Sequence, residues 1–297
     1  MDALLSAKLL RQLEQFQLLA QRRAKSSARG ERRSRSRGQS VEFADYRTYV
    51  AGDDFRYLDW NLYGRLERLF VKLYEEEREL PVRIFLDASE SMTFGQPRKF
   101  DFARQVAAAV GYVALCGFDR VSVIPFPDQP EQLAVCGALR TVRGRKSALE
   151  FFRNITQLSA AGGVNLNDAL RRGALEARQA GVAVVLSDFL DPAGYEKGLE
   201  ALVGRGFHVN AVQILSPEEL NPSTYGDLKL VDAESGSIQE VTFGKYRLKS
   251  YQQTVQNFCQ RLREFCQSRG IRFFMASSGT PLEQLLLQQL REAEVWG

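Results

Sequence analysis

Apolar and polar positions alternate in blocks along the chain from about residue 81 onward. Short apolar runs between turn residues are typical of buried strands, and longer segments with apolar residues three or four positions apart are typical of helices. The apolar runs predict strands at 82–86, 121–126, 182–188, 207–215 and 271–277, with a short edge strand at 132–136. The longer periodic segments predict helices at about 99–118, 145–158, 167–179, 193–204, 245–269 and 281–294.

The order of these segments predicts an α/β fold. Strands that alternate with helices form a mostly parallel sheet with helices on both faces, so we expect a doubly wound sheet of six strands. The strands are nearly continuous apolar runs, as expected for strands that are covered on both faces. Pro217 and Pro222 interrupt the alternation, and the following text, GDLKLVDAESGSIQEVTF, predicts a β-hairpin inserted at about 221–243.

The first 80 residues have a different pattern. Leucines at helical spacing predict an amphipathic helix over 3–22, and a basic, serine-rich arm follows, with eight Lys or Arg residues against one Glu in RRAKSSARGERRSRSRG. Aromatic, acidic and arginine residues then mix up to residue 80, with a turn at 52–54 and a strand near 70–74. We therefore divide the chain into a helix with a flexible arm (1–38), an extended segment (39–80) and an α/β domain (81–297).

Candidate chemistry gathers where the first strand of the α/β domain ends. In VRIFLDASESM, Asp87 ends the apolar run, and Ser89 and Ser91 follow at two-residue spacing. Asp188 ends a later apolar strand in the same way. Parallel strands bring their carboxyl ends to one edge of a sheet, where open α/β sheets place their sites. Oxygen ligands of this kind suit a hard cation such as Mg²⁺.

The spacing D-x-S-x-S, with Asp188 on a later strand, resembles the metal-ion-dependent adhesion site of von Willebrand factor type A domains, which have a Rossmann-like fold. The resemblance covers about residues 81–297 and implies a binding module with Asp87, Ser89, Ser91 and Asp188 around Mg²⁺. Where that family carries a threonine, this chain has Val164. One hydroxyl ligand is therefore missing, and Asn165 or Asn167, or a water molecule, would have to replace it.

The segment EFADYRTYVAGDDFRYLDWN resembles the bacterial family Domain of Unknown Function 58, which places this text just ahead of a type A-like domain. The matching residues are Arg47, Tyr49, Gly52, Asp53, Asp54, Arg56, Asp59, Trp60 and Asn61. The resemblance implies a partner, a MoxR-type AAA+ ATPase, and a role in assembly or maturation of protein complexes. From the residues themselves, the segment favours packing, with Arg56 bonding nearby acids and Trp60 covering the sheet, and contact with a partner is the alternative.

Composition and charge narrow the possibilities further. The chain is 44% hydrophobic and 26% charged with a formal net charge of only +4, which gives no basis for a global polyelectrolyte role. Its cysteines and single His208 lack zinc-site spacing, so we expect buried thiols in a reducing compartment. The sequence contains no apolar run of membrane-span length and no signal-peptide pattern, so we expect a soluble, cytoplasmic protein.

Three other interpretations stay open. The Asp87 cluster could be purely structural, because an Asp at a strand end also bonds loop amides. A Mg²⁺-dependent hydrolase could use the same carboxylates with Asp168 or Asp128 as a base. The basic arm could bind nucleic acid. Phosphate-binding glycine loops are absent and a Ser-His-Asp triad is improbable with one histidine, so a protein-binding role, not an enzyme, is the prediction.

Overall fold

The computed structural model describes residues 4–14, 41–76, 80–127, 137, 139–163, 165–222, 226–231, 238–243 and 245–285. The chain divides into two units. Met1–Ser26 and Leu80–Gly297 form the first unit, and Ser27–Glu79 form the second. The predicted basic arm at 22–37 and the predicted edge strand at 132–136 lie outside the described residues.

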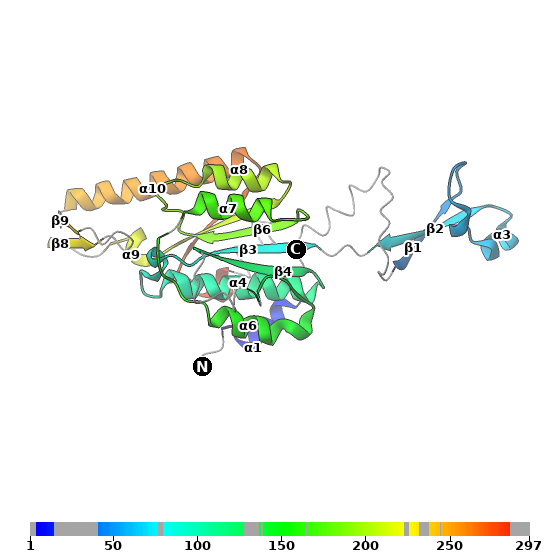
Figure 1. Cartoon of the computed structure of the whole chain (residues 1–297), viewed down its shortest axis with the longest axis horizontal. Helices are drawn as coiled ribbons and strands as arrows, with labels where there is room; N and C mark the ends of the chain where they lie inside the picture. Colours follow the sequence, from blue (N-terminus) through cyan, green and yellow to red (C-terminus); the bar gives the residue numbers. More distant parts are fainter. Residues whose placement is uncertain are drawn as a thin grey trace. The chain divides into compact units, whose positions relative to one another are not determined.

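A six-stranded sheet forms the centre of the first unit (Figure 1). Its strands run in the order β10-β7-β6-β3-β4-β5, and every neighbouring pair is parallel except β4 and β5. The bounds are β3 Pro81–Asp87, β4 Arg120–Phe126, β5 Val142–Arg143, β6 Val182–Ser187, β7 His208–Leu215 and β10 Arg272–Ser277. The predicted doubly wound, mostly parallel sheet of six strands is thereby confirmed, and the short antiparallel β5 forms one edge.

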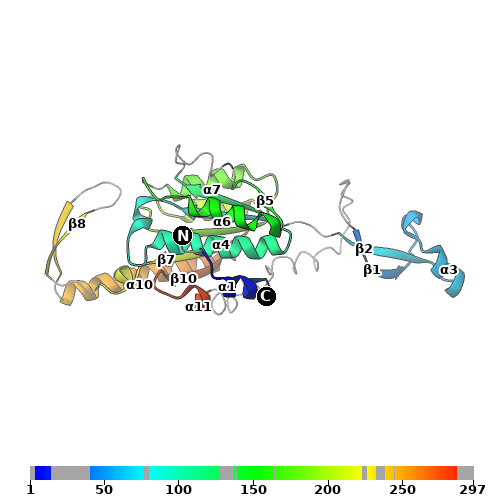
Figure 2. The same cartoon turned by 90° about the horizontal axis from the view of Figure 1, so that it is seen from below.

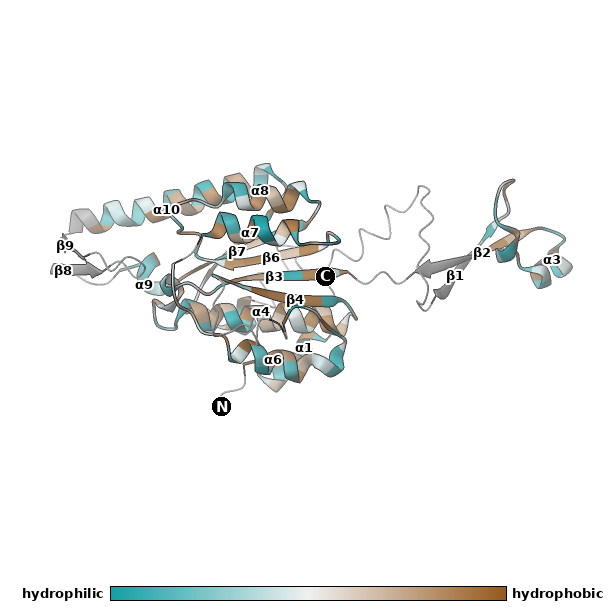
Figure 3. Cartoon of the chain, in the orientation of Figure 1, coloured by the Kyte–Doolittle hydropathy of each residue, from teal (hydrophilic) through white to brown (hydrophobic). Residues whose placement is uncertain are grey.

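The strands form because their apolar runs are buried on both faces. Every residue of β6 is buried, and Ile84 of β3 lies in register with Val123 of β4 and Val184 of β6. Alternate residues of β3 enter different cores: Ile84 faces one core and Phe85 faces the other. Figure 3 shows the hydrophobic colouring concentrated along these central strands. A sheet covered in this way holds the carboxyl ends of β3 and β6 rigidly beside each other.

Helices cover the two faces of the sheet in two groups (Figure 1). One face carries α1 Ala7–Leu13, α4 Lys99–Cys116, α6 Ala148–Thr156 and the short α11 Leu282–Gln284. The other face carries α7 Leu166–Leu175, α8 Glu196–Gly204 and α10 Lys245–Ser268. The helix predicted at 145–158 begins as a 3₁₀ turn, η4 Arg145–Ser147, before α6. Only three residues of the helix predicted at 281–294 lie within α11, because residues 286–297 lie outside the described residues.

The amino-terminal helix α1 packs on the body of the first unit (Figures 1 and 2). Leu5, Leu9 and Leu13 are buried in the same core as α4, and the Ser6 hydroxyl caps the helix by accepting from the Leu9 amide at 3.2 Å. The carboxylate of Glu14 accepts from the Tyr112 hydroxyl of α4 at 2.8 Å. The leucine spacing predicted this helix correctly, and residues 15–22 of the predicted range lie outside the described residues.

The second unit is a small hairpin with a helix. Strands β1 Val41–Thr48 and β2 Phe70–Glu76 pair antiparallel, and η1 Phe55–Tyr57 and α3 Trp60–Leu66 lie between them in the chain. The predicted strand near 70–74 and the turn at 52–54 are present.

Two acidic residues hold the turns of this unit. Asp54 binds the Arg56 guanidinium at 2.6 Å, as the sequence indicated. Asp59 caps α3 and accepts from the Tyr46 hydroxyl at 3.0 Å, and it forms an ion pair with Lys72 at 3.1 Å. Within this unit Trp60 is 63% exposed, and the expectation that it covers the flank of the α/β sheet stays a prediction.

The insertion after β7 has two parts. Helix α9 Pro217–Leu220 comes first, and the hairpin of β8 Gly226–Val231 and β9 Ile238–Phe243 follows before α10. The hairpin predicted at 221–243 is therefore present, and Figure 2 shows β8 beyond the amino-terminal end of α10. Across the described ranges of the chain, no helix is both long and apolar enough to span a bilayer.

Candidate functional site

Asp87 is the last residue of β3, and its carboxylate is buried and fully engaged by the chain. One oxygen, Oδ1, accepts from the Ser89 amide at 3.0 Å and from the Ser89 hydroxyl at 2.6 Å. The other, Oδ2, accepts from the Ser187 hydroxyl at 2.6 Å. The Ser89 and Ser91 hydroxyls lie 3.0 Å apart. The D-x-S spacing thus makes a local turn that ends the strand, and Ser187 ties that turn to β6.

Asp188 follows β6 directly and is equally buried, but its partner is a cation. Its Oδ2 accepts from the Lys99 ammonium at 2.7 Å, and its Oδ1 accepts from the Leu190 amide at 3.0 Å. Lys99 is the first residue of α4 and is 1% exposed. The ammonium also donates to Glu219 of α9 at 2.6 Å. One buried cation therefore joins the sheet, α4 and the insertion.

The loop after Asp188 is held in an unusual conformation. Phe189 has a φ of 60°, in the left-handed region that a bulky residue rarely adopts. Its amide donates to the Ser187 hydroxyl at 2.9 Å, and its buried ring packs edge-on against Tyr195 at 6.0 Å. This packing offsets the backbone strain and fixes the turn that presents Asp188 to Lys99.

Glu219 is positioned by a capping box at the start of α9. The Ser216 hydroxyl accepts from the Glu219 amide at 3.1 Å, and Glu219 Oε2 accepts from the Ser216 amide at 2.7 Å. The loop at 94–98 packs closely on this cap, because a Cβ added at Gly95 would lie 2.3 Å from Ser216 Cβ. The amide of Gln96 donates to Glu218 at 3.2 Å, which holds the same loop. The insertion thereby closes over the ammonium of Lys99.

Burial and neighbouring charges shift the pKa of two groups in this cluster, Asp87 and Lys99. Burial and, after it, the charge of Asp188 raise the pKa of Asp87 to about 7, although hydrogen bonds from Ser187 and Ser89 oppose the rise. Burial alone would lower the pKa of Lys99, but the carboxylates of Asp188 and Glu219 outweigh it and the pKa lies above its usual value. Lys99 is therefore charged at neutral pH.

The structure brings most of the predicted site residues together. Asp87, Ser89 and Ser91 form one hydrogen-bonded group, and the charge of Asp188 is close enough to shift the pKa of Asp87. Their role as metal ligands stays a prediction. Val164 and Asp128 lie outside the described residues.

The two asparagines proposed as substitute ligands are used for structure. The Asn165 side chain caps α7 and bonds Asp168, with its Oδ1 accepting from the Asp168 amide at 3.1 Å and its amide group donating to the Asp168 carboxylate at 2.8 Å. The Asn167 side-chain oxygen accepts from the Gly198 amide at 2.7 Å, at the start of α8. Asp168, the base considered for a hydrolase, is thus already paired with Asn165.

Sequence reasoning missed three residues of this site: Lys99, Glu219 and Ser187. The signals were present but weak. Ser216 and Glu219 have the S-x-x-E spacing of a capping box, and Ser187 directly precedes Asp188. In the sequence, Lys99 is an ordinary polar residue at the start of a predicted helix. The neighbouring residues give no indication that its side chain is buried.

The residues of this site do not fit a divalent cation in the arrangement that the structure shows. Asp188 Oδ2, an oxygen that such a cation would need, carries the Lys99 ammonium. Both oxygens of Asp87 accept from hydroxyl groups. No group of three or more His, Cys, Asp or Glu side chains suited to a metal occurs among the described residues. The expected Mg²⁺ stays a prediction.

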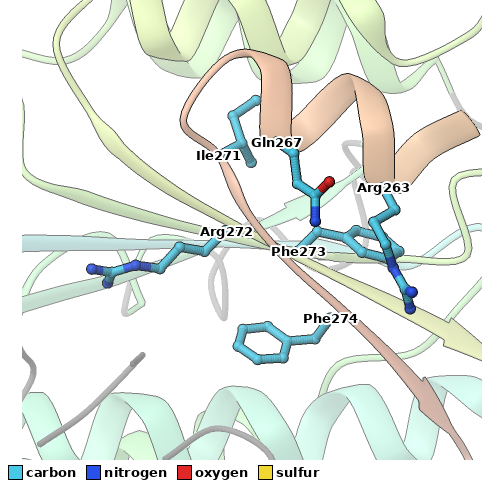
Figure 4. A pocket seen from close by; sticks show the side chains of 6 residues that line it. All are labelled: Arg263, Gln267, Ile271, Arg272, Phe273 and Phe274. Atoms are coloured by element: carbon cyan, nitrogen blue, oxygen red, sulfur yellow. The ribbon is translucent and has the colours of Figure 1, made fainter. Parts of the chain in front are cut away.

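A hollow of about 420 Å³ lies elsewhere on the first unit, between α10 and β10 (Figure 4). Its lining residues are Arg263, Gln267, Ile271, Arg272, Phe273 and Phe274. The Arg263 guanidinium lies 5.8 Å from the centre of the Phe273 ring. Strands β7 and β6 separate β10 from β3 in the sheet, so this hollow is distinct from the Asp87 cluster.

Comparison with known proteins identifies the family. The family model described as "Protein of unknown function DUF58" matches residues 45–258. The chain belongs to this DUF58 family. The match covers the second unit from β1 onward together with most of the first unit, so both units are part of the DUF58 pattern.

Relatives of this DUF58 chain occur in mycobacteria. Uncharacterized protein Rv1480 of Mycobacterium tuberculosis is 32% identical over 214 residues, which are 68% of this chain and 64% of that protein. Uncharacterized protein MAV169 of Mycobacterium avium is 40% identical over 75 residues, 25% of this chain and 42% of that protein. The chain thus spans 64% of the length of the first of these relatives.

Two solved structures are similar to this DUF58 chain at low identity. The conserved hypothetical protein BatB from Bacteroides thetaiotaomicron is 14% identical with a TM-score of 0.41, and the match covers 72% of this chain and 98% of that one. An aerotolerance-related membrane protein from Bacteroides fragilis is 15% identical with a TM-score of 0.39, covering 72% of this chain and 99% of that one.

Proposed function

We propose that this DUF58 chain is a protein-binding module that contacts its partner through the loops at the carboxyl end of the central sheet. The observation that carries the proposal is the exposure of Phe94 and Leu190. They are 52% and 47% exposed, although Ser91 lies only three residues before Phe94 and the buried Asp188 only two residues before Leu190. Large apolar side chains on loops held by a rigid sheet are typical of the contacts that dominate protein interfaces.

The position of these loops in the fold also supports a binding surface at the carboxyl end of the sheet. Strands β3 and β6 are neighbours at the point where the strand order reverses, and the crevice at the carboxyl end of such a sheet is where doubly wound folds bind ligands. The resemblance to von Willebrand factor type A domains, which use this end for binding, agrees with it. Within the proposal the buried polar cluster shapes the loops, and the exposed apolar residues at its rim make the contact.

A non-catalytic role fits the chemistry available at this end of the sheet. His208, the one histidine of the chain, begins β7 and therefore lies at the opposite end of the strands from Asp87. Asp168 and Asn165 bond each other, and Lys99 is held between Asp188 and Glu219. These pairings support binding over hydrolysis, because a general base needs a free lone pair near the reacting proton.

The partner that we propose is a MoxR-type AAA+ ATPase, which is the partner that the DUF58 resemblance implies, acting with this chain in assembly or maturation of protein complexes. We further propose that this happens in the cytoplasm. The exposed side chains of Phe94 and Leu190 provide surface for such a contact without requiring nucleic acid.

The test is a binding titration of the full chain against a purified MoxR-type ATPase from the same genome. Biolayer interferometry measures the binding. Phe94→Ala and Leu190→Ala should each weaken binding about five- to thirty-fold, the loss expected when an interface anchor is truncated. Phe118→Ala and Leu175→Ala are matched controls, because both side chains are exposed at the opposite end of the strands. Absence of binding by the wild type, or equal losses in the controls, would refute the proposal.

A further inference from the structure

We propose that the Lys99 ammonium is a built-in cation that takes the place of a divalent metal in this site, with Glu219 of the insertion acting as its second carboxylate ligand. The inference does not rest on the proposed function, because it concerns the buried charges of the site and not what binds to the exposed loops.

The geometry of Lys99 is that of a held ion. Its nitrogen lies 2.7 Å from Asp188 Oδ2 and 2.6 Å from Glu219 Oε1, and the side chains of Lys99 and Asp188 are 1% and 3% exposed. A buried ammonium is stable only when paired with opposite charge and hydrogen-bonded. The two carboxylates come from different elements, the end of β6 and α9, as the ligands of a metal site commonly do.

The backbone around Lys99 is fixed by hydrogen bonds at the start of α4 and in the loop before it. Its amide donates to the Phe94 carbonyl at 3.2 Å, which ties the start of α4 to the loop. Beyond it, the Ser278 hydroxyl donates to the Pro97 carbonyl at 2.7 Å, so the loop is held from a second side. The neighbouring residues Phe100 and Phe102 are buried. The backbone around Lys99 is therefore fixed, and its ammonium is held by Asp188 and Glu219.

Two further features support the Lys99 ammonium as the cation of this site: the repulsion that a metal ion would meet, and the hydrogen bonds that the oxygen groups already make. A divalent ion bound to Asp188 would lie within a few ångströms of the ammonium, in surroundings where like charges are poorly screened. The hydroxyl of Ser89 and both oxygens of Asp87 are already joined to one another and to Ser187. The oxygen groups that a metal would recruit are thus satisfied by the chain itself.

The capping box explains why Glu219 belongs to the site. Its Oε2 accepts from the Ser216 amide while its Oε1 accepts from Lys99, so one carboxylate serves both the cap and the cation. A partner's carboxylate could reach the ammonium only by displacing Glu219 and breaking that cap. The insertion therefore completes the cation's surroundings within one chain.

The first experiment measures Mn²⁺ binding to the full chain by electron paramagnetic resonance. The wild type should leave the signal of free Mn²⁺ unchanged at millimolar concentrations. Lys99→Met removes the ammonium and leaves Asp188 and Glu219 facing each other, so it should bind Mn²⁺ at concentrations at least about tenfold below the highest at which the wild type shows no binding. Lys99→Met combined with Asp188→Asn should lose this gain. A folded Lys99→Met chain with no gain in Mn²⁺ binding would contradict the proposal.

A second measurement on the wild type keeps the test independent of variant folding. The ammonium of Lys99 should give a protected ¹⁵N–H signal in a lysine-selective spectrum, and Lys99→Arg identifies it by its absence. Millimolar Mg²⁺ should leave the signal unmoved. Tight Mn²⁺ binding by the wild type that Asp188→Asn abolishes, or a Mg²⁺-dependent loss of the Lys99 signal, would overturn the proposal. Neither result would change the effect of Phe94→Ala on partner binding, so the two proposals can fail separately.

Discussion

Removal of the Lys99 ammonium should destabilise the first unit strongly, and the loss should depend on Asp188. Lys99→Met leaves the Asp188 carboxylate, which is 3% exposed, without its cation. Removal of one partner from a buried ion pair costs about 3–5 kcal/mol, because the remaining charge stays buried. The Glu219 side chain is 14% exposed and can turn toward water, so it adds little to this cost.

A double-mutant cycle measures the coupling free energy between Lys99 and Asp188. Asp188→Asn keeps Lys99 paired with Glu219 and should cost about 1–3 kcal/mol. The double variant, Lys99→Met with Asp188→Asn, removes both charges of the pair and leaves no unpaired charge at residue 188. It should therefore be about 2 kcal/mol more stable than the sum of the two single losses predicts. Urea unfolding at pH 7, followed by far-ultraviolet circular dichroism, gives each free energy of unfolding.

The control is an ion pair on the surface. Arg269 binds Glu200 at 2.7 Å with both side chains well exposed, so Arg269→Met should cost only about 1 kcal/mol or less. If the losses at Lys99 and Asp188 add without coupling, or if Lys99→Met costs no more than Arg269→Met, the buried pair does not have the energetic role that its geometry indicates.

Three further predictions concern packing and charge. Gly173→Ala places a Cβ 2.2 Å from the Phe85 ring and should cost about 1–3 kcal/mol in urea unfolding, whereas Gly64→Ala, in open space on a helix, should be neutral or slightly stabilising. Leu9→Ala should cost about 2–5 kcal/mol, and a melting temperature equal to wild type would show that α1 does not contribute to the core. Hydrogen bonds and an ion pair lower the pKa of Asp59 to about 2, so its stabilisation is complete above pH 4 and lost as pH falls through about 2; a carbon-13 titration midpoint near its ordinary value of 3.8 would contradict this.

The central sheet could be predicted because its signal is local. Runs such as the one ending at Leu186 are apolar at every position, and only a strand covered on both faces needs that pattern. The turn at Asp87 could also be predicted from the sequence, because its carboxylate accepts from a serine only two residues away. Helix ends were less readable, because the segment before α6 is a 3₁₀ turn whose side chains are compatible with either helix.

The rest of the site could not be predicted because its contacts join distant parts of the chain. Lys99 meets Asp188 at a separation of 89 residues and Glu219 at a separation of 120. Periodicity gives the face of a helix on which a residue lies, but not which distant side chain meets it at the helix end. Asn165 shows the converse case: its position suggested a ligand, and in the structure its side chain caps α7.

The docking of α1 on α4 also has a consequence for synthesis of the chain. Leu5, Leu9 and Leu13 leave the ribosome before α4, and the helix that buries them ends at Cys116, roughly 100 residues later. At about 5–20 residues per second, the three leucines wait roughly 5–20 s before their partner surface exists. During each round of translation this short helix is therefore an exposed apolar segment, open to chaperones and to neighbouring nascent chains until α4 emerges.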